Sequence, residues 1–198
     1  MVVIELPMGD SEAPATAKQF VEGMKKELNP SPKCTKLGFI FVWRRAQAVL
    51  NMRCDYKGCY RNGLRAIDGI TRQVSRIKGV QQYQKGSLIK ALHMATAQLY
   101  STKEGARMNA EKVVILVLSN PPVKGVAKIE DEVKDYHDMR IRFIAVGVGA
   151  GRKEKLADIV VDNALKIEFE SMQDLAAAGV KTIAIKIPFK TGKWSTTN

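Results

Sequence analysis

Short apolar runs alternate along this chain with stretches in which apolar residues recur at helical spacing. Val113–Leu118 and Ile141–Val148 are almost uninterrupted apolar runs of strand length, as expected of strands buried on both faces. Between residues 64 and 77, apolar side chains instead recur every three or four positions, which predicts an amphipathic helix. We predict strands at Val2–Leu6, Leu37–Trp43, Ala46–Met52, Val113–Leu118, Ile141–Val148 and Leu165–Phe169, and helices at Ala15–Leu28, Leu64–Ile77, Ser87–Leu99, Ile129–His137, Glu154–Val160 and Met172–Ala178.

The order of these elements predicts an α/β fold. Strands that alternate with helices form a doubly wound, mostly parallel sheet with helices on both faces. The two strands around Arg44-Arg45 follow each other directly, so we expect an antiparallel hairpin whose second strand is one edge of a six-stranded sheet. We expect one domain over residues 1–181. Residues 182–198 are interpreted as an extension or linker, because Ile183, Ile185 and Ile187 alternate before the chain becomes polar.

The buried run Phe143-Ile144-Ala145-Val146-Gly147-Val148-Gly149 is similar to the fifth strand of the von Willebrand factor A domain. The likeness extends to Lys90-Ala91-Leu92 in a predicted helix, to Val113–Leu118 and to Ser171-Met172-Gln173-Asp174-Leu175 near the end. These pieces stand in the order and spacing of that family and span roughly residues 2–180. The resemblance implies a Rossmann-like sheet and a non-enzymatic module that binds proteins.

The resemblance also implies where a Mg²⁺ adhesion site would lie, and the residues there depart from the family pattern. The family holds its cation with aspartate, serine and threonine oxygens at the carboxyl end of the sheet. Of the corresponding positions, Ser11 alone matches, and Asp10 is the one carboxylate near enough to shift into such a site. We therefore expect a degenerate site and no metal or other cofactor. The five positions are Pro7, Gly9, Ser11, Gly86 and Asn120.

Positive charge is the main feature of the composition. The chain has a formal net charge of +12 at pH 7, which favours polyanionic partners. Four arginines recur at intervals of four, seven and four, which places them on one side of a helix, opposite its apolar side. Arginine binds sulfate, phosphate and carboxylate through two parallel hydrogen bonds. We predict a basic binding face made of Arg44, Arg45, Arg61, Arg65, Arg72 and Arg76.

The three cysteines, Cys34, Cys54 and Cys59, cluster around the predicted hairpin. A turn at Arg44-Arg45 brings Cys34 nearly opposite Cys54, which makes a cross-strand disulfide possible. Cys34 with Cys59 is the rival pairing, and the sequence does not choose between them. Either pairing favours an oxidising compartment. The chain begins without a signal-peptide pattern, so a secreted protein would be present here as a mature or excised form.

No catalytic motif is recognisable. The sequence has neither a phosphate-binding loop nor a nucleophile elbow, and His93 and His137 have no acid and nucleophile at suitable spacing. No apolar run reaches the length of a membrane span. We predict a secreted adhesion module of the extracellular matrix, in a longer protein with neighbouring domains, that binds collagen-like chains or sulfated glycans without a metal. The alternative is an intracellular scaffold or a nucleic-acid-binding domain that uses the same basic surface.

Overall fold

The computed structural model describes residues 1–7, 10–30, 35–43, 45–52, 57–75, 87–120, 129–136, 138–149, 156 and 165–187. Within these ranges six strands form a single sheet in the order β3-β2-β1-β4-β5-β6. All neighbouring pairs are parallel except β2 with β3, which are antiparallel. The predicted sheet is therefore confirmed. Its strands are β1 (Val2–Glu5), β2 (Phe39–Val42), β3 (Ala46–Leu50), β4 (Lys112–Leu118), β5 (Ile141–Val148) and β6 (Leu165–Phe169).

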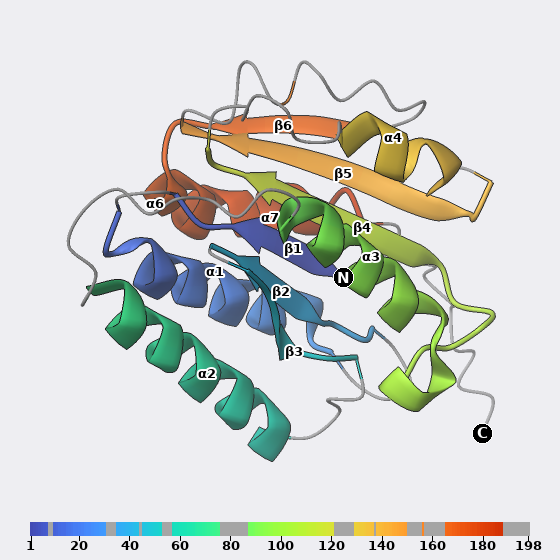
Figure 1. Ribbon diagram of the computed structural model, residues 1–198, viewed down its shortest axis with the longest axis horizontal. Helices are drawn as coiled ribbons and strands as arrows, with labels where there is room; N and C mark the ends of the chain where they lie inside the picture. The colour runs from blue at the N-terminus through green and yellow to red at the C-terminus, as the bar shows by residue number, and fades with distance from the viewer. Residues whose placement is uncertain are drawn as a thin grey trace, which may run out of the picture.

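Helices cover both faces of the sheet (Figure 1). One face packs against α1 (Ala13–Leu28), α2 (Lys57–Ser75) and α7 (Val180–Ala184), and the other against α3 (Ser87–Tyr100) and α4 (Ile129–Val133). Side chains of β1 alternate between the two cores: Val2 and Ile4 face the first, Val3 the second. Both faces of the central strands are thus covered, which explains their almost continuous apolar sequence.

Local hydrogen bonds set the ends of α1. The Asp10 carboxylate Oδ1 accepts hydrogen bonds from the backbone N–H of Glu12 at 2.8 Å and of Ala13 at 3.1 Å. These amides have no partner inside the helix, so the carboxylate satisfies them. At the other end Asn29 adopts a left-handed conformation (φ 40°) and its N–H donates to the Lys25 carbonyl, which stops the helix.

The last helix differs from its prediction. It begins at Met172, where the Ser171 hydroxyl accepts a hydrogen bond from the Asp174 N–H, and it continues as α6 (Met172–Asp174), a π-helical turn, η4 (Leu175–Gly179), and α7. The predicted boundary at Lys181 falls inside α7. Ile183 is fully buried in the core, so its alternation with Ile185 does not mark an extended segment. The extension beyond residue 187 lies outside the described residues.

Two other predicted helices also differ in extent. α2 begins at Lys57, seven residues before the predicted start. The segment predicted at Ile129–His137 divides into α4 and a 3-10 turn, η2 (Lys134–Tyr136), and His137 lies outside the described residues. Of the predicted helix Glu154–Val160, only Leu156 is described; it is helical and buried.

Candidate functional site

The carboxyl ends of β1 and β4 meet where the family resemblance implies a cation. A glutamate occupies the centre of this edge. Glu5, the last residue of β1, has an exposed fraction of 0%. Its carboxylate Oε2 accepts hydrogen bonds from the backbone N–H of Ser119 at 2.9 Å and of Asn120 at 3.1 Å. In return the Ser119 hydroxyl donates to the Glu5 carbonyl at 2.6 Å.

These bonds explain how a carboxylate is tolerated in the interior. A buried charge is strongly disfavoured unless hydrogen bonds replace its hydration. Two backbone amides at the end of β4 provide that replacement, and Asn120 adds a further link because its side-chain Nδ2 donates to the Leu6 carbonyl at 2.9 Å. Glu5 thus joins the ends of two neighbouring strands. The sequence carried one sign of this role, an acidic residue inside the apolar run Val2–Leu6.

The described residues at this edge do not fit a divalent cation. Pro7 has no side-chain donor, and the Asn120 side chain is buried with its amide nitrogen bound to Leu6. Ser11 is exposed, while the Asp10 carboxylate Oδ1 is engaged at the start of α1. Gly9 and Gly86 lie outside the described residues. Within the described part of the chain, no cluster of three or more histidine, cysteine or acidic residues is arranged to hold a metal.

The structure places three of the predicted arginines on one exposed helical face. Arg61, Arg65 and Arg72 are exposed on α2, whose opposite side buries Ile67 and Ile70. Arg61 and Arg65 form no hydrogen bond or ion pair with other residues that the structure describes. Arg45 is exposed at the start of the hairpin strand β3, whereas Arg44 and Arg76 lie outside the described residues. We call Arg61, Arg65 and Arg72 the arginine face of α2.

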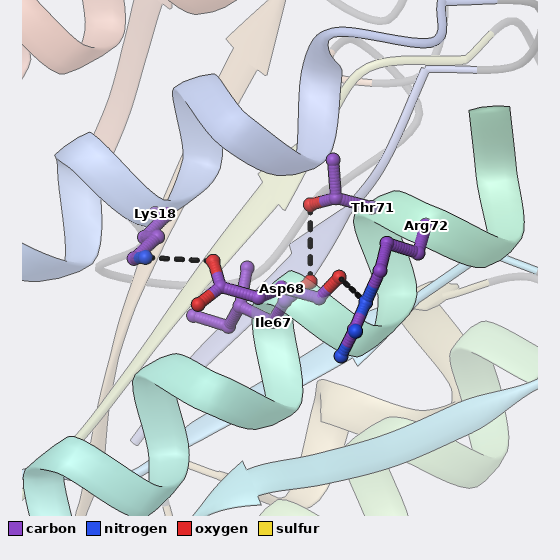
Figure 2. A network of polar contacts seen from close by, with 5 residues as sticks. All are labelled: Lys18, Ile67, Asp68, Thr71 and Arg72. Atoms are coloured by element: carbon purple, nitrogen blue, oxygen red, sulfur yellow. Dashed lines mark hydrogen bonds and ion pairs between the residues drawn. The ribbon is translucent and has the colours of Figure 1, made fainter.

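A small polar network holds α2 against α1 beneath this face (Figure 2). Lys18 of α1 forms an ion pair with the Asp68 carboxylate at 2.6 Å. Asp68 is the acidic residue of α2, and its backbone carbonyl also accepts a hydrogen bond from Arg72 Nε at 3.4 Å. The Lys18 ammonium therefore neutralises the acidic group closest to the arginines in this network, and the face keeps its positive charge.

Few of the remaining predicted residues are described by the structure. Cys34 and Cys54 lie outside the described residues, and of Cys59 only the backbone, within α2, is described. His93 on α3 contacts the Glu132 carboxylate of α4, with its own side chain mostly exposed. This pair joins two surface helices. No described helix is both long and apolar enough to cross a membrane.

Comparison with known proteins agrees with this geometry. The sequence matches the von Willebrand factor type A domain over residues 8–183. A search of curated proteins by sequence finds no significant match. Among solved structures, proximal thread matrix protein 1 from the mussel byssus is similar with a TM-score of 0.61 and 16% identity. That likeness covers 92% of this chain and 45% of the byssus protein, so this chain spans about half its length.

Two further structures resemble the chain to the same degree. One is the same byssus protein with a zinc-occupied MIDAS motif, at a TM-score of 0.62 and 16% identity, covering 92% of this chain and 46% of that one. The other is the conserved hypothetical protein BatB from Bacteroides thetaiotaomicron, at a TM-score of 0.59 and 15% identity, covering 93% of this chain and 97% of that one. At such identities the likeness establishes the fold alone.

Proposed function

This chain belongs to the von Willebrand factor type A domain family, and from that premise we propose that it is a non-enzymatic binding module for an anionic partner of the extracellular matrix. Domains of this family are typically protein-binding modules. The partner we propose is a glycan-bearing or collagen-like matrix protein. Binding takes place on the arginine face of α2 and needs no divalent cation.

The observation that carries this proposal is the grouping of three exposed arginines on one helix of a chain with a net charge of +12. Each guanidinium offers paired donors that match a sulfate or carboxylate group. The description of the mussel protein as a thread matrix protein supports the matrix setting, although the structural likeness to it rests on the fold. The unsuitable donors around Asn120 support binding away from the carboxyl edge of the sheet.

The test compares heparin and duplex DNA as ligands over a range of salt concentrations. We expect heparin to bind at physiological salt, and the triple variant R61Q/R65Q/R72Q to weaken it by at least tenfold. Each anionic contact contributes nearly one unit to the slope of log K against log salt, so the variant should lower that slope by about three. If neither polyanion binds, the proposal is wrong.

A matched control removes three positive charges elsewhere. Lys90, Lys134 and Lys181 are exposed on α3, η2 and α7, and K90Q/K134Q/K181Q lowers the net charge by the same amount. This variant should retain most of the affinity. An equal loss in both variants would mean that the overall charge, and not the arginine face, attracts the ligand.

The alternative function is an intracellular domain that binds nucleic acid, and the net charge favours it too. Preference for DNA over heparin would support that function. The thiol count separates the compartments as well. Because disulfides persist in oxidising compartments, three free thiols in the native protein would contradict the matrix setting.

A further inference from the structure

A groove of about 610 Å³ crosses the amino ends of β4 and β5, at the edge of the sheet opposite Glu5. In Figure 1 the strand arrows point away from this edge, which lies near the end of α3. No residue of the arginine face of α2 lines the groove. The polar, aromatic and exposed side chains considered below are Tyr100, Met108, Glu111, Lys112, Arg140 and Arg142, all of which line the groove.

Two turns form the walls of the groove, and the side chains of buried Lys112 and half-buried Tyr100 hold them. The Lys112 ammonium donates to the carbonyls of Met108 at 3.0 Å and Ala110 at 3.3 Å, which fixes the turn before β4. The Tyr100 hydroxyl donates to the Met139 carbonyl, and the Met139 N–H donates to the Asp135 carbonyl at 3.0 Å. The turn before β5 is therefore fixed as well. A groove formed in advance loses little conformational freedom on binding.

The groove presents two exposed arginines. Arg140 and Arg142 are exposed and form no hydrogen bond or ion pair with any residue in the described part of the chain. Glu111 is the acidic residue among those that line the groove, against three basic ones. The free charge in the groove is thus positive, and arginine favours carboxylate or phosphate partners.

Arg140 has a backbone conformation that is unusual for its residue type. Its φ is +55°, in the left-handed region that glycine adopts without penalty and that other residues seldom adopt. A residue other than glycine at such a position carries a conformational cost. A strained residue of this kind is a reason to look for a function of its side chain.

The other lining residues favour a peptide over a nucleic acid. Met108 is 59% exposed, and methionine is a common contact residue at peptide-binding surfaces. Lys112 covers one face of the Tyr100 ring at 4.8 Å from its centroid, so that face is not open for base stacking. Arg140 and Arg142 are two residues apart, which matches the alternation of side chains along an extended peptide.

We propose that this groove binds an extended acidic segment of a partner protein. Aspartate or glutamate side chains of the segment pair with Arg140 and Arg142, and an aliphatic side chain next to this pair on the same face of the segment packs on Met108. The site is independent of the proposed function, because it uses no residue of the arginine face.

Selection from a phage-displayed library of random dodecapeptides tests the proposal on the full chain. We expect enrichment of peptides with acidic residues two positions apart. Their binding, measured by fluorescence polarisation with the enriched peptide, should fall at least tenfold in R140G/R142Q. R61Q/R65Q, with the same loss of charge, should leave it unchanged.

The choice of glycine at position 140 separates binding from folding. Since glycine tolerates a positive φ, R140G should lose no more than about 2 °C of melting temperature. Enrichment without acidic residues, an equal loss in R61Q/R65Q, or equal binding of a peptide whose acids are replaced by amides would each overturn the proposal. Displacement of the peptide by duplex DNA but not by an acidic competitor peptide would overturn it in favour of a nucleic-acid groove.

Discussion

Glu5 and Ser119 are joined twice across the ends of β1 and β4. The Ser119 N–H donates to the Glu5 carboxylate at 2.9 Å, and the Ser119 hydroxyl donates to the Glu5 carbonyl at 2.6 Å. The two residues are 114 positions apart in sequence. Both are buried at the edge where the family resemblance implies a cation.

Replacing Glu5 should therefore be costly. In E5A the amides of Ser119 and Asn120 lose the carboxylate that satisfies them inside the protein, and we expect the free energy of unfolding to fall by roughly 3 kcal/mol. E5Q keeps an acceptor oxygen and should lose less. Urea denaturation measures both. The exposed Glu168 on β6 gives the matched control, since E168A should change stability by no more than about 0.5 kcal/mol. Equal effects at the two positions would contradict the role of Glu5.

Divalent cations should not stabilise the protein. A ligand that binds the native state raises its melting temperature, and the donors around Asn120 are poorly suited to bind one. Thermal unfolding in the presence of Mg²⁺, Mn²⁺ or Ca²⁺ should match unfolding in a chelator. A rise in melting temperature that D10A abolishes would show that Asp10 and Ser11 form a shifted cation site.

Replacing Tyr60 with phenylalanine should stabilise the protein. Its hydroxyl is buried with no hydrogen-bond partner among the described residues, while its ring packs in the core below Lys25. Y60F should raise the free energy of unfolding by about 1 kcal/mol, because it removes an unsatisfied buried group. Tyr136 is the matched control. Its hydroxyl pairs with Thr96 at 3.0 Å, so Y136F should lower stability. The same sign for both variants would contradict the explanation.

Alkaline pH provides a second test of Tyr60. Burial raises the pKa of this hydroxyl above its usual value. The unfolded chain loses the tyrosine proton near pH 10, whereas the folded protein keeps it to a higher pH. The free energy of unfolding therefore has its full value below about pH 10 and falls as the pH rises from the pKa of the unfolded state towards that of the folded state. The free energy of unfolding of the wild type should therefore decrease more steeply above pH 10 than that of Y60F. If the free energies of unfolding of the wild type and Y60F changed equally with pH, the Tyr60 hydroxyl would be exposed to solvent.

Asp68 should limit polyanion binding more than it supports the fold. Its ion pair with Lys18 has side-chain exposures of 28% for Lys18 and 48% for Asp68, so its loss should cost no more than about 1 kcal/mol. D68N also removes the negative charge next to the arginine face. We expect heparin affinity to rise two- to threefold, on the order of the change that one nearby screened charge produces. A fall in affinity would mean that Asp68 orients Arg72 for binding.

The contact between α1 and α7 permits little additional volume. A Cβ atom on Gly23 would lie 2.7 Å from Val180 Cγ2. G23A should therefore lower the free energy of unfolding by about 1–3 kcal/mol, although alanine is the better helix former. In the double variant G23A/V180A the clash disappears, so its loss should be smaller than the sum of the two single losses. Simple additivity would show that the helices move apart without cost.

The strands were predictable because their signal is local. The bounds of β5 and β6 agree with those predicted, since an apolar run or a short alternation is complete within a few residues. The start of α2 was missed because Lys57–Gly63 contains two glycines and Asn62, which are poor helix formers. Packing sets the start of this helix. Tyr60 is buried, and a Cβ on Gly63 would lie 2.9 Å from the Val49 carbonyl oxygen, so the close approach of α2 to β3 requires glycine.

The sites were less predictable than the strands. Arg61, Arg65 and Arg72 are exposed on one side of α2, as their spacing indicates, while their role in binding stays a prediction. The partners of Glu5, however, come from the far end of another strand, and the turn that contains Arg140 is held by the Tyr100 hydroxyl of α3. Contacts between distant segments decide both features, and no local pattern in the sequence reports them.

The link between Glu5 and the end of β4 also has a consequence for regulation. A bound ion is present only in proportion to its concentration and is removed by chelators. Glu5 is part of the chain, so its effective concentration at Ser119 and Asn120 is set by the fold and is the same in every medium. The link between β1 and the end of β4 is therefore made by the chain itself and does not depend on free calcium or magnesium.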